Sequence, residues 1–313
     1  MTRALVSIGT NSTRLLILGE GDAPVVAESR GTRLGAGIGT TGSIDLVAKI
    51  RTLAAVDEYV GIARANGVTA VDAIATSVLR RASDGEAFGR EVEHRIGVVP
   101  RVLTGEEEAT YSFLGATAQR PGAESVAVLD VGGGSTEIAV DTPAHARSTG
   151  AVGLSMSLEI GAVRLSERHP ALLGQTALAP AARRSLEIEA RSYALGVLTP
   201  LSEARGFGEL IAVGGTVFTA AAMIADGARD GAPMTRADCA GLIDALLSRD
   251  LEARKQMPHI RPQRADILPA GLIVVDEACR MLDVDHFTVS EADLLYGYLT
   301  SRSFRSEPFV AKG

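Results

Sequence analysis

Lysine is nearly absent from this 313-residue chain, in which it occurs only as Lys49, Lys255 and Lys312. Positive charge therefore falls to arginine, whose planar guanidinium fork suits phosphate oxygens. The formal net charge is −7, which argues against a broad nucleic-acid-binding face. A polyanionic ligand would need local positive charge rather than an overall attraction.

Several other features are missing, and each excludes a class of protein. The two cysteines, Cys239 and Cys279, have no metal-ligand spacing, so we expect buried free thiols. No apolar run approaches the roughly 18 residues that a membrane span requires. The N-terminus lacks a signal-peptide layout, so the cytoplasm is the expected location. No Gly-Lys-Ser or Gly-Lys-Thr sequence occurs, which argues against a P-loop kinase.

The most informative feature is an internal repeat. Residues Val6–Ile17 match Leu129–Val140, and Gly132 of the second copy follows Gly9 of the first by 123 residues, a domain-sized spacing. Each copy reads as an apolar strand, a Gly/Ser/Thr turn and a second apolar strand. Glycine lets backbone N–H groups approach an anion closely, so two such hairpins, one per domain, could hold a phosphate chain from both sides. One copy alone would be an ordinary turn, but the match between two copies favours function.

The rest of the chain alternates between strand and helix patterns, which predicts an α/β fold. A third glycine turn, Ile211–Thr216, is expected to lead into a helix over 217–225 with Thr216 as its cap. It could be an anion site or a purely structural turn. The polar stretch Gln119–Glu124 is the best interdomain linker. Strands are predicted at 25–29, 70–75 and 98–103, and helices at 45–65, 86–95, 106–118, 181–204, 236–256, 266–282 and 291–302.

Acidic residues lie beside these turns. A capping-box pattern that begins at Thr104 places Glu106–Glu108 in the first turn of a helix, where the helix dipole alone could explain them. Asp130 closes a strand just before the second glycine turn, and Glu137 opens the next strand. Two carboxylates beside a phosphate loop suit Mg²⁺, which prefers oxygen ligands and keeps several waters. A further carboxylate near the cleft could hold an attacking water.

Seven segments occur in the order found in a known protein family: Ile8–Leu16, Ala75–Arg80, Thr104–Ala109, Asp130–Glu137, Gly161–Glu167, Val213–Thr216 and Arg264–Asp266. From about residue 4 to residue 299, the chain resembles the exopolyphosphatase/guanosine pentaphosphate phosphatase (Ppx/GppA) family, in its short form without the C-terminal HD-type domain. The resemblance implies two ribonuclease-H-like domains of the actin-like ATPase superfamily, residues 1–119 and 120–297, with a phosphate-binding cleft between them. A C-terminal helix, about 298–313, is expected to pack back on the first domain.

The resemblance also implies roles for individual residues. Glu108 aligns with a glutamate that activates water, and Asp130 and Glu137 align with acids that hold Mg²⁺ or another divalent cation and assist the attack. The implied activity is release of the terminal phosphate from inorganic polyphosphate or guanosine pentaphosphate. Neither a nucleic acid nor a membrane partner is expected, and a homodimer is possible. The implied phosphate-binding residues are Gly9, Thr10, Asn11, Ser12, Arg14, Gly132, Gly133, Gly134, Ser135, Thr136, Gly214, Gly215 and Thr216.

Three positions depart from the family pattern. Ser7 stands where the family has Asp, and the repeat pairs it with Asp130, so metal affinity is expected to be lower. Near the C-terminus, Leu295 replaces an arginine and Asp293 a glycine. These departures keep a second function open, a catalytically weak protein that senses polyphosphate or guanosine tetraphosphate. A sugar-kinase-like phosphotransferase is a third, although the Glu106–Glu108 segment favours the hydrolase.

Overall fold

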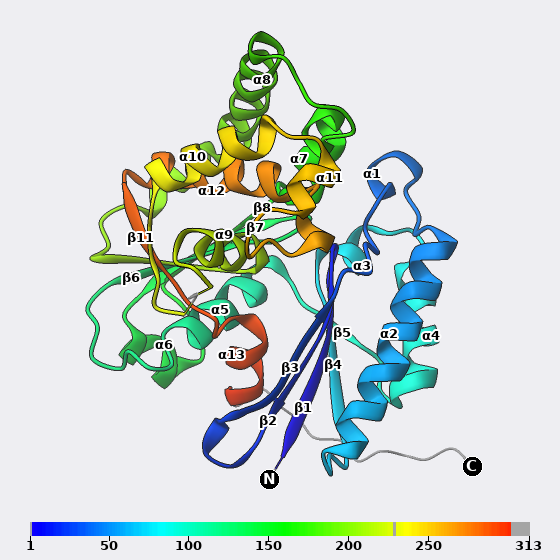
Figure 1. Ribbon diagram of the computed structural model, residues 1–313. Helices are drawn as coiled ribbons and strands as arrows, with labels where there is room; N and C mark the ends of the chain where they lie inside the picture. The colour runs from blue at the N-terminus through cyan, green and yellow to red at the C-terminus, as the bar shows by residue number, and fades with distance from the viewer. Residues whose placement is uncertain (1, 228–229, 302–313) are drawn as a thin grey trace.

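Two mixed β-sheets organise the chain (Figure 1). The structure is a computed structural model that describes residues 2–227 and 230–301. Its strands are β1 (Arg3–Ile8), β2 (Thr13–Leu18), β3 (Pro24–Arg30), β4 (Val71–Ala75), β5 (Arg101–Val102), β6 (Val126–Val131), β7 (Thr136–Asp141), β8 (Leu154–Leu158), β9 (Glu209–Val213), β10 (Pro233–Thr235) and β11 (His286–Val289). The first sheet has the order β3-β2-β1-β4-β5, and the second has the order β10-β11-β9-β6-β7-β8.

Helices cover both faces of the central strands, which explains why those strands are apolar throughout. Because side chains alternate along a strand, β1 contributes to two cores. Val6 and Ile8 pack in one core, and Leu5 packs in another. The helices are α1 (Ile38–Thr41), α2 (Leu46–Ala65), α3 (Ser77–Arg81), α4 (Gly85–Ile96), α5 (Gly105–Ala116), α6 (Pro143–Thr149), α7 (Ala162–Arg168), α8 (Pro180–Leu198), α9 (Gly215–Ile224), α10 (Arg236–Leu247), α11 (Leu251–Lys255), α12 (Leu268–Leu282) and α13 (Leu294–Thr300).

The sequence repeat is a structural repeat as well. Strands β1 and β2 form an antiparallel hairpin in which Ser7 lies opposite Arg14, and β6 and β7 form a second hairpin in which Asp130 lies opposite Glu137. In each sheet the first strand of the hairpin also pairs with a parallel strand, β4 in one case and β9 in the other. This shared topology confirms the predicted fold class, two ribonuclease-H-like α/β domains.

Helices α5 and α13 pack against each other between the two sheets. Ala109 and Phe113 of α5 pack in a core with residues of the second sheet, whereas Tyr111 packs with α13 and with strands of the first sheet. The two helices cross closely, because a side chain on Gly297 would overlap the carbonyl oxygen of Tyr111. Helix α13 corresponds to the helix predicted over 291–302, and the C-terminal helix expected over about 298–313 lies almost wholly outside the described residues, which end at Ser301. The division at residues 119 and 120 stays a prediction.

Some predicted elements were wrong in extent. The helix expected over 236–256 is two helices, because the Asp250 side chain accepts a hydrogen bond from the backbone N–H of Ala253 at 2.9 Å and starts α11 as a new helix. The helix expected over 181–204 ends at Leu198 and continues as a 3₁₀ helix, where Pro200 has no N–H for the α-helical ladder. The strand expected over 98–103 is only the two residues of β5.

The start of α9 was also predicted wrongly. The helix begins at Gly215, so Thr216 lies inside its first turn rather than at its cap. Gly214 occupies the cap position with φ of 98°, a left-handed region that favours glycine. Both cysteines are buried free thiols, as predicted. Among the described residues, no helix combines the length and apolarity needed to cross a bilayer.

The crossing of α5 and α13 predicts the effect of one methyl group. Gly297→Ala places a Cβ against the backbone of α5, so we expect a loss of about 1–3 kcal/mol in the free energy of unfolding. Gly61→Ala is the matched control, because Gly61 lies in α2 with open space around its Cβ position, and it should gain about 0.5–1 kcal/mol from helix propensity. Urea denaturation of both variants measures the difference. Equal stability of the two would contradict this packing.

Candidate active site

A cleft of about 110 Å³ lies where the three glycine turns meet the first turn of α5. This volume is small beside the roughly 300–1,000 Å³ of a typical small-molecule pocket, so it suits phosphate groups better than a whole nucleotide. Of the predicted site residues, the following line it: Gly9, Thr10, Asn11, Ser12, Arg14, Glu108, Asp130, Gly132, Gly133, Gly134, Ser135, Glu137, Gly214 and Gly215.

The first two turns have the same internal hydrogen bond and lie against each other. The N–H of Gly9 donates to the carbonyl of Ser12 at 3.0 Å, and the N–H of Gly132 donates to that of Ser135 at 3.0 Å. A Cβ on Gly134 would lie 2.7 Å from Thr10 Oγ1, a distance that real Cβ atoms essentially never show. The absence of a side chain at this glycine therefore allows the two domains to meet at their turns.

The third turn closes the cleft beside an acid. A Cβ on Gly214 would lie 2.9 Å from Asp130 Oδ1, so this turn approaches the end of β6 closely. No side chain caps the N-terminus of α9. Its first N–H groups therefore carry the partial positive charge of a helix start, which favours an anion.

Two predicted phosphate-binding residues do not line the cleft, and their side-chain assignment is corrected. The hydroxyl of Thr136 donates to the carbonyl of Ile160 at 2.7 Å and is fully buried. The side chain of Thr216 packs against α12, where a Cβ on Gly271 would overlap it. Both hydroxyls serve the packing of the second domain.

Glu108 lies at the start of α5 and faces the cleft. A complete capping box between Thr104 and Glu107 begins the helix, so Glu108 is not needed for the cap. Its side chain forms an ion pair with Arg80 and is almost fully buried. Burial raises the pKa of Glu108 to about 7, with Arg80 opposing the shift and the Asp130 carboxylate adding to it. A carboxyl group with this pKa suits a general base at neutral pH.

Asp130 and Glu137 are cross-strand partners, so their carboxylates lie on the same face of the second sheet. The hydroxyl of Ser112 donates to Asp130 Oδ2 at 2.8 Å, and that of Ser157 donates to Glu137 Oε1 at 2.8 Å. Burial and the nearby carboxylate of Asp293 raise the pKa of Asp130 to about 6. Burial and two neighbouring carboxylates, Glu108 and Asp130, hold the pKa of Glu137 well above its usual range.

The carboxylate pair fits the donor set that Mg²⁺ uses beside phosphates. Within residues 2–227 and 230–301, no group of three or more His, Cys, Asp or Glu side chains is arranged to hold a metal ion. Phosphate-processing sites commonly hold Mg²⁺ through one or two carboxylates, with waters and substrate oxygens as the remaining ligands. Asp130 and Glu137 offer two such oxygen ligands on one face of the sheet.

Arg14 lines the cleft, but its charge is already paired. Its Nη1 lies 2.6 Å from Oδ2 of Asp293, one of the three positions expected to depart from the family pattern. Burial by itself would lower the pKa of Arg14. The adjacent carboxylate of Asp293 more than offsets this effect, so the pKa of Arg14 is raised. The other two departures also face the cleft, since Ser7 and Leu295 both line it. The three unusual positions are therefore neighbours in space.

Sequence reasoning missed several residues around the cleft. Arg264 of the second domain donates to Ser12 Oγ at 3.2 Å, and a side chain on Gly215 would overlap its guanidinium. Among the described residues it has no carboxylate partner. Burial and two nearby arginines lower the pKa of Arg264 to about 10, so it stays charged at neutral pH. Thr76 and Ser77, at the start of α3, also line the cleft. Segments 75–80 and 264–266, which belong to the resemblance to the family, were the available signals.

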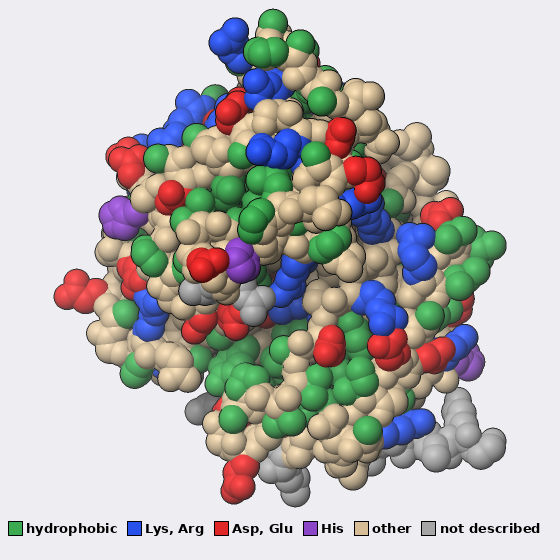
Figure 2. Space-filling model, in the orientation of Figure 1, with side chains coloured by type: hydrophobic (Ala, Val, Ile, Leu, Met, Phe, Trp, Pro, Cys, Tyr) green, Lys and Arg blue, Asp and Glu red, His purple; other side chains and the backbone are tan. Residues whose placement is uncertain are grey.

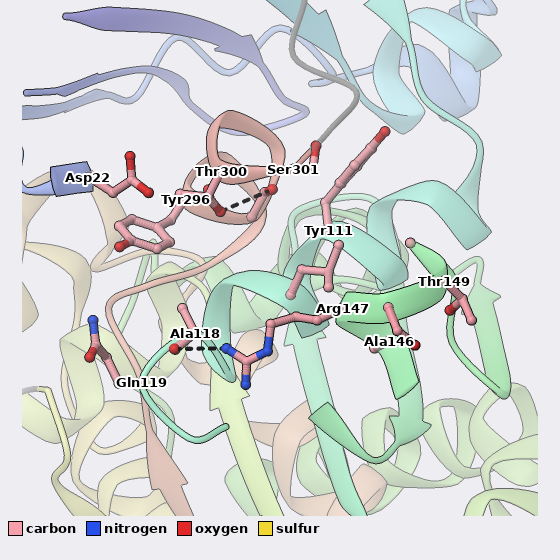
Figure 3. A pocket seen from close by; sticks show the side chains of 14 residues that line it. Asp22, Tyr111, Ala118, Gln119, Ala146, Arg147, Thr149, Tyr296, Thr300 and Ser301 are labelled. Carbon is pink, nitrogen blue, oxygen red and sulfur yellow. Dashed lines mark hydrogen bonds between the residues drawn. The ribbon is translucent and has the colours of Figure 1, made fainter. Parts of the chain in front are cut away.

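A second pocket, of about 510 Å³, lies between α5, α6 and α13 (Figure 3). Its charged lining residues are Asp22, which pairs with Arg3, and Arg147, which donates to the carbonyl of Ala118 at 3.2 Å. It contains none of the predicted site residues. With one arginine in its lining, this pocket lacks the charge that a polyphosphate would require.

The two-domain fold and its glycine-lined cleft define a protein that binds phosphate groups between paired α/β domains. Residues 19–303 match the Ppx/GppA phosphatase family, and the chain belongs to that family of enzymes. It is 33% identical to exopolyphosphatase 2 of Mycobacterium tuberculosis, over 95% of this chain and 97% of that protein. A solved exopolyphosphatase-like protein superposes with a TM-score of 0.84 at 28% identity, covering 97% of this chain and 99% of that one. The solved structure of the Aquifex aeolicus Ppx/GppA family member superposes with a TM-score of 0.73 at 26% sequence identity, covering 96% of each chain.

The buried carboxylates predict how stability depends on pH. Because the pKa values of Asp130, Glu108 and Glu137 are raised in the folded protein, the folded state binds protons more tightly than the unfolded chain does. Their contribution is therefore most favourable below about pH 4, the pKa range of unfolded carboxyl groups, and falls as the pH rises through about 6 and about 7. In metal-free buffer, we expect the shift of Asp130 alone to reduce the free energy of unfolding by on the order of 3 kcal/mol by pH 8, and the whole cluster to reduce it by more.

Glu137→Gln tests this expectation, because it removes one charge and keeps the size of the side chain. The variant should be more stable than wild type at about pH 8 and nearly equal to it at about pH 3.5, where Glu137 is protonated in the folded protein and largely protonated in the unfolded chain. Glu91→Gln, at an exposed position of α4, is the control and should leave the pH profile unchanged. Parallel pH profiles for Glu137→Gln and wild type would exclude the proposed repulsion.

Proposed function

We propose that this chain releases the terminal phosphate of inorganic polyphosphate by attack of a water that Glu108 activates. The observation that carries the proposal is the position of Glu108, a buried carboxylate with a pKa of about 7 that faces a cleft lined by three glycine turns. Family membership supports hydrolysis, and the relative from Mycobacterium tuberculosis is named an exopolyphosphatase. Guanosine pentaphosphate is the alternative substrate.

Each part of the cleft has a proposed role in this reaction. Backbone N–H groups of the glycine turns, together with Arg14 and Arg264, would bind the phosphate oxygens. Water attacks the terminal phosphorus while the bond from that phosphorus to the bridging oxygen breaks. Glu108 accepts the proton of the water, and the shortened chain leaves with the bridging oxygen. Arg80, paired with Glu108, would hold the base in position.

Mg²⁺ is the cofactor we propose, with Asp130 and Glu137 as its protein ligands. When bound, it would neutralise charge on the phosphate oxygens. Ser7 lies in the cleft where a third carboxylate would stand, and a serine can orient a water but supplies no charge. Loss of such an outer partner typically costs about 10- to 100-fold in metal affinity or activity. We therefore propose a weakened rather than an absent metal site.

A second candidate function is favoured by the same neighbourhood. Ser7 weakens the metal site and Asp293 pairs with Arg14, which are features of a protein that binds polyphosphate and hydrolyses it poorly. Phosphate release from long-chain polyphosphate with Mg²⁺ separates the two. Binding without release would favour the sensing protein. A cytoplasmic location and a homodimer stay predictions.

Removal of the proposed base gives the sharpest test of the hydrolysis. Glu108→Gln keeps the size of the side chain and should lower kcat by about 10²- to 10⁴-fold, with a much smaller effect on substrate binding. Glu106→Gln is the matched control, because Glu106 lies in the same helical turn with an exposed side chain. Steady-state phosphate release measures both. If Glu108→Gln turns over like Glu106→Gln, then Glu108 is only a charge at a helix start.

The Arg14–Asp293 pair predicts an effect in the opposite direction. Asp293 Oδ1 also accepts the N–H of Leu295 at 3.1 Å and caps α13, and asparagine caps helices as well as aspartate does. Asp293→Asn therefore removes the charge, keeps the cap and releases Arg14 for phosphate. We expect KM for polyphosphate to fall on the order of tenfold. Adding Arg14→Gln should cancel this gain, and a KM that rises in Asp293→Asn would show that the pair orients Arg14 for substrate.

A further inference from the structure

The pocket between α5, α6 and α13 is separate from the active cleft (Figure 3). Its volume of about 510 Å³ lies within the roughly 300–1,000 Å³ of a typical small-molecule pocket, whereas the cleft has only about 110 Å³. Among the described residues, none lines both the pocket and the cleft. The pocket therefore has room for a ligand of its own, distinct from the phosphates that the cleft would hold.

One side of the pocket is apolar and aromatic. Leu114 of α5 and Tyr296 of α13 line it, and Tyr296 is only partly buried. The ring of Tyr111 is committed to the protein, because it packs edge to face on Tyr298 with the ring centroids 5.0 Å apart. On the face shown in Figure 2, hydrophobic side chains gather where α13 lies. Tyr296 is thus the aromatic surface on which the ring of a ligand could pack.

Arg147 supplies the positive charge of the pocket. It lies in the last turn of α6, and its side chain extends towards the end of α5, where Nη1 donates to the carbonyl of Ala118 at 3.2 Å (Figure 3). A guanidinium has five N–H donors, so others remain for a ligand. No carboxylate of the described residues pairs with Arg147. The other charged lining residue, Asp22, is already paired with Arg3.

The helices that form the pocket also reach the cleft. Glu108, in the first turn of α5, faces the cleft, and Tyr111 of the same helix lines the pocket. On α13, Leu295 lines the cleft and the next residue, Tyr296, lines the pocket. The close contact between Gly297 and the backbone of α5 joins the two helices. A ligand that moves either helix would therefore move groups in the cleft.

We propose that this pocket binds a compound with a planar aromatic ring and a single anionic group, and that the bound ligand acts on the cleft through α5 and α13. The ring would pack on Tyr296 and Leu114, and a carboxylate or phosphate would accept the N–H groups of Arg147. Aromatic carboxylates and nucleoside monophosphates share this chemistry. The binding site does not depend on the proposed hydrolysis.

Titration calorimetry with indoleacetate and with adenosine monophosphate measures the binding and distinguishes the two sources of such a ligand. We expect at least one of them to bind wild type, and Arg147→Gln to weaken that binding by about tenfold, the size of a lost hydrogen bond to a charged group. Tyr296→Leu, which removes the ring, should weaken it as well. Arg184→Gln is the matched control, because Arg184 is an exposed arginine of α8 outside the pocket, and it should bind like wild type.

Three results would overturn the site. The first is that neither probe binds. The second is equal binding by Arg147→Gln and Arg184→Gln, which would place the probe elsewhere, including in the cleft. The third is that inorganic phosphate binds as tightly as adenosine monophosphate, because the ring would then contribute nothing.

Phosphate release from tripolyphosphate, with and without saturating probe, tests the action on the cleft. We expect the probe to change kcat/KM of wild type by about fivefold and to have little effect on Arg147→Gln at the same concentration. An unchanged rate in wild type with probe bound would overturn the coupling. If wild type releases no phosphate at all, the proposed hydrolysis fails. The coupling is then measured as a change in affinity for tripolyphosphate, because coupling between two binding sites is reciprocal.

Discussion

The two glycine turns touch, and the rest of the site depends on that contact. Gly134 fits against Thr10 because it carries no side chain, and this fit brings the hairpin ends of both domains together. The carboxylates at those strand ends are thereby withdrawn from water, which raises their pKa values. The same exclusion of water strengthens every hydrogen bond that the turns can offer to a phosphate. Packing at one glycine therefore sets the electrostatics of the whole cleft.

Burial of several carboxylates close together destabilises the folded state. Hydrogen-bond donors and arginines next to these carboxylates partly offset that cost. Serine hydroxyls donate to Asp130 and Glu137, and arginines of the first domain lie beside Glu108 and Asp293. These contacts reduce the repulsion but leave the pKa values high. A site of this kind is stabilised by whatever brings positive charge to it, because a ligand that binds only the folded state adds its binding free energy to stability.

Much of the fold and the centre of the site could be predicted from the sequence, because the repeat has a physical cause. A constant offset between two strand-turn-strand patterns preserves register, so Ser7 and Arg14 had to face each other as Asp130 and Glu137 do. The positions of the turn glycines could be predicted for the same reason, because they recur at the same offset. The capping box at Thr104 was equally local, and the structure contains it.

The residues that sequence reasoning missed are those that tertiary packing brings in. Arg264 comes from a short 3₁₀ helix (Pro262–Arg264) far along the chain, and nothing in its own segment says that it meets Ser12. Ser112 and Ser157 donate to the acids from a helix and an edge strand with ordinary patterns. The pairing of Asp293 with Arg14 joins the two ends of the chain. The mistaken helix boundaries at Thr216 and Pro200 had local causes that were overlooked.

The register of the two hairpins gives the cleft a polarity. At the same pair of positions, the first copy carries a serine and an arginine, and the second copy carries two acids. The repeated pattern thus places one arginine, Arg14, on one side of the cleft and two carboxylates on the other. A cation that enters together with an anion is therefore favoured on the side of the second hairpin, where the two carboxylates lie. The divergence of the two copies, rather than their likeness, therefore sets the direction in which a substrate lies.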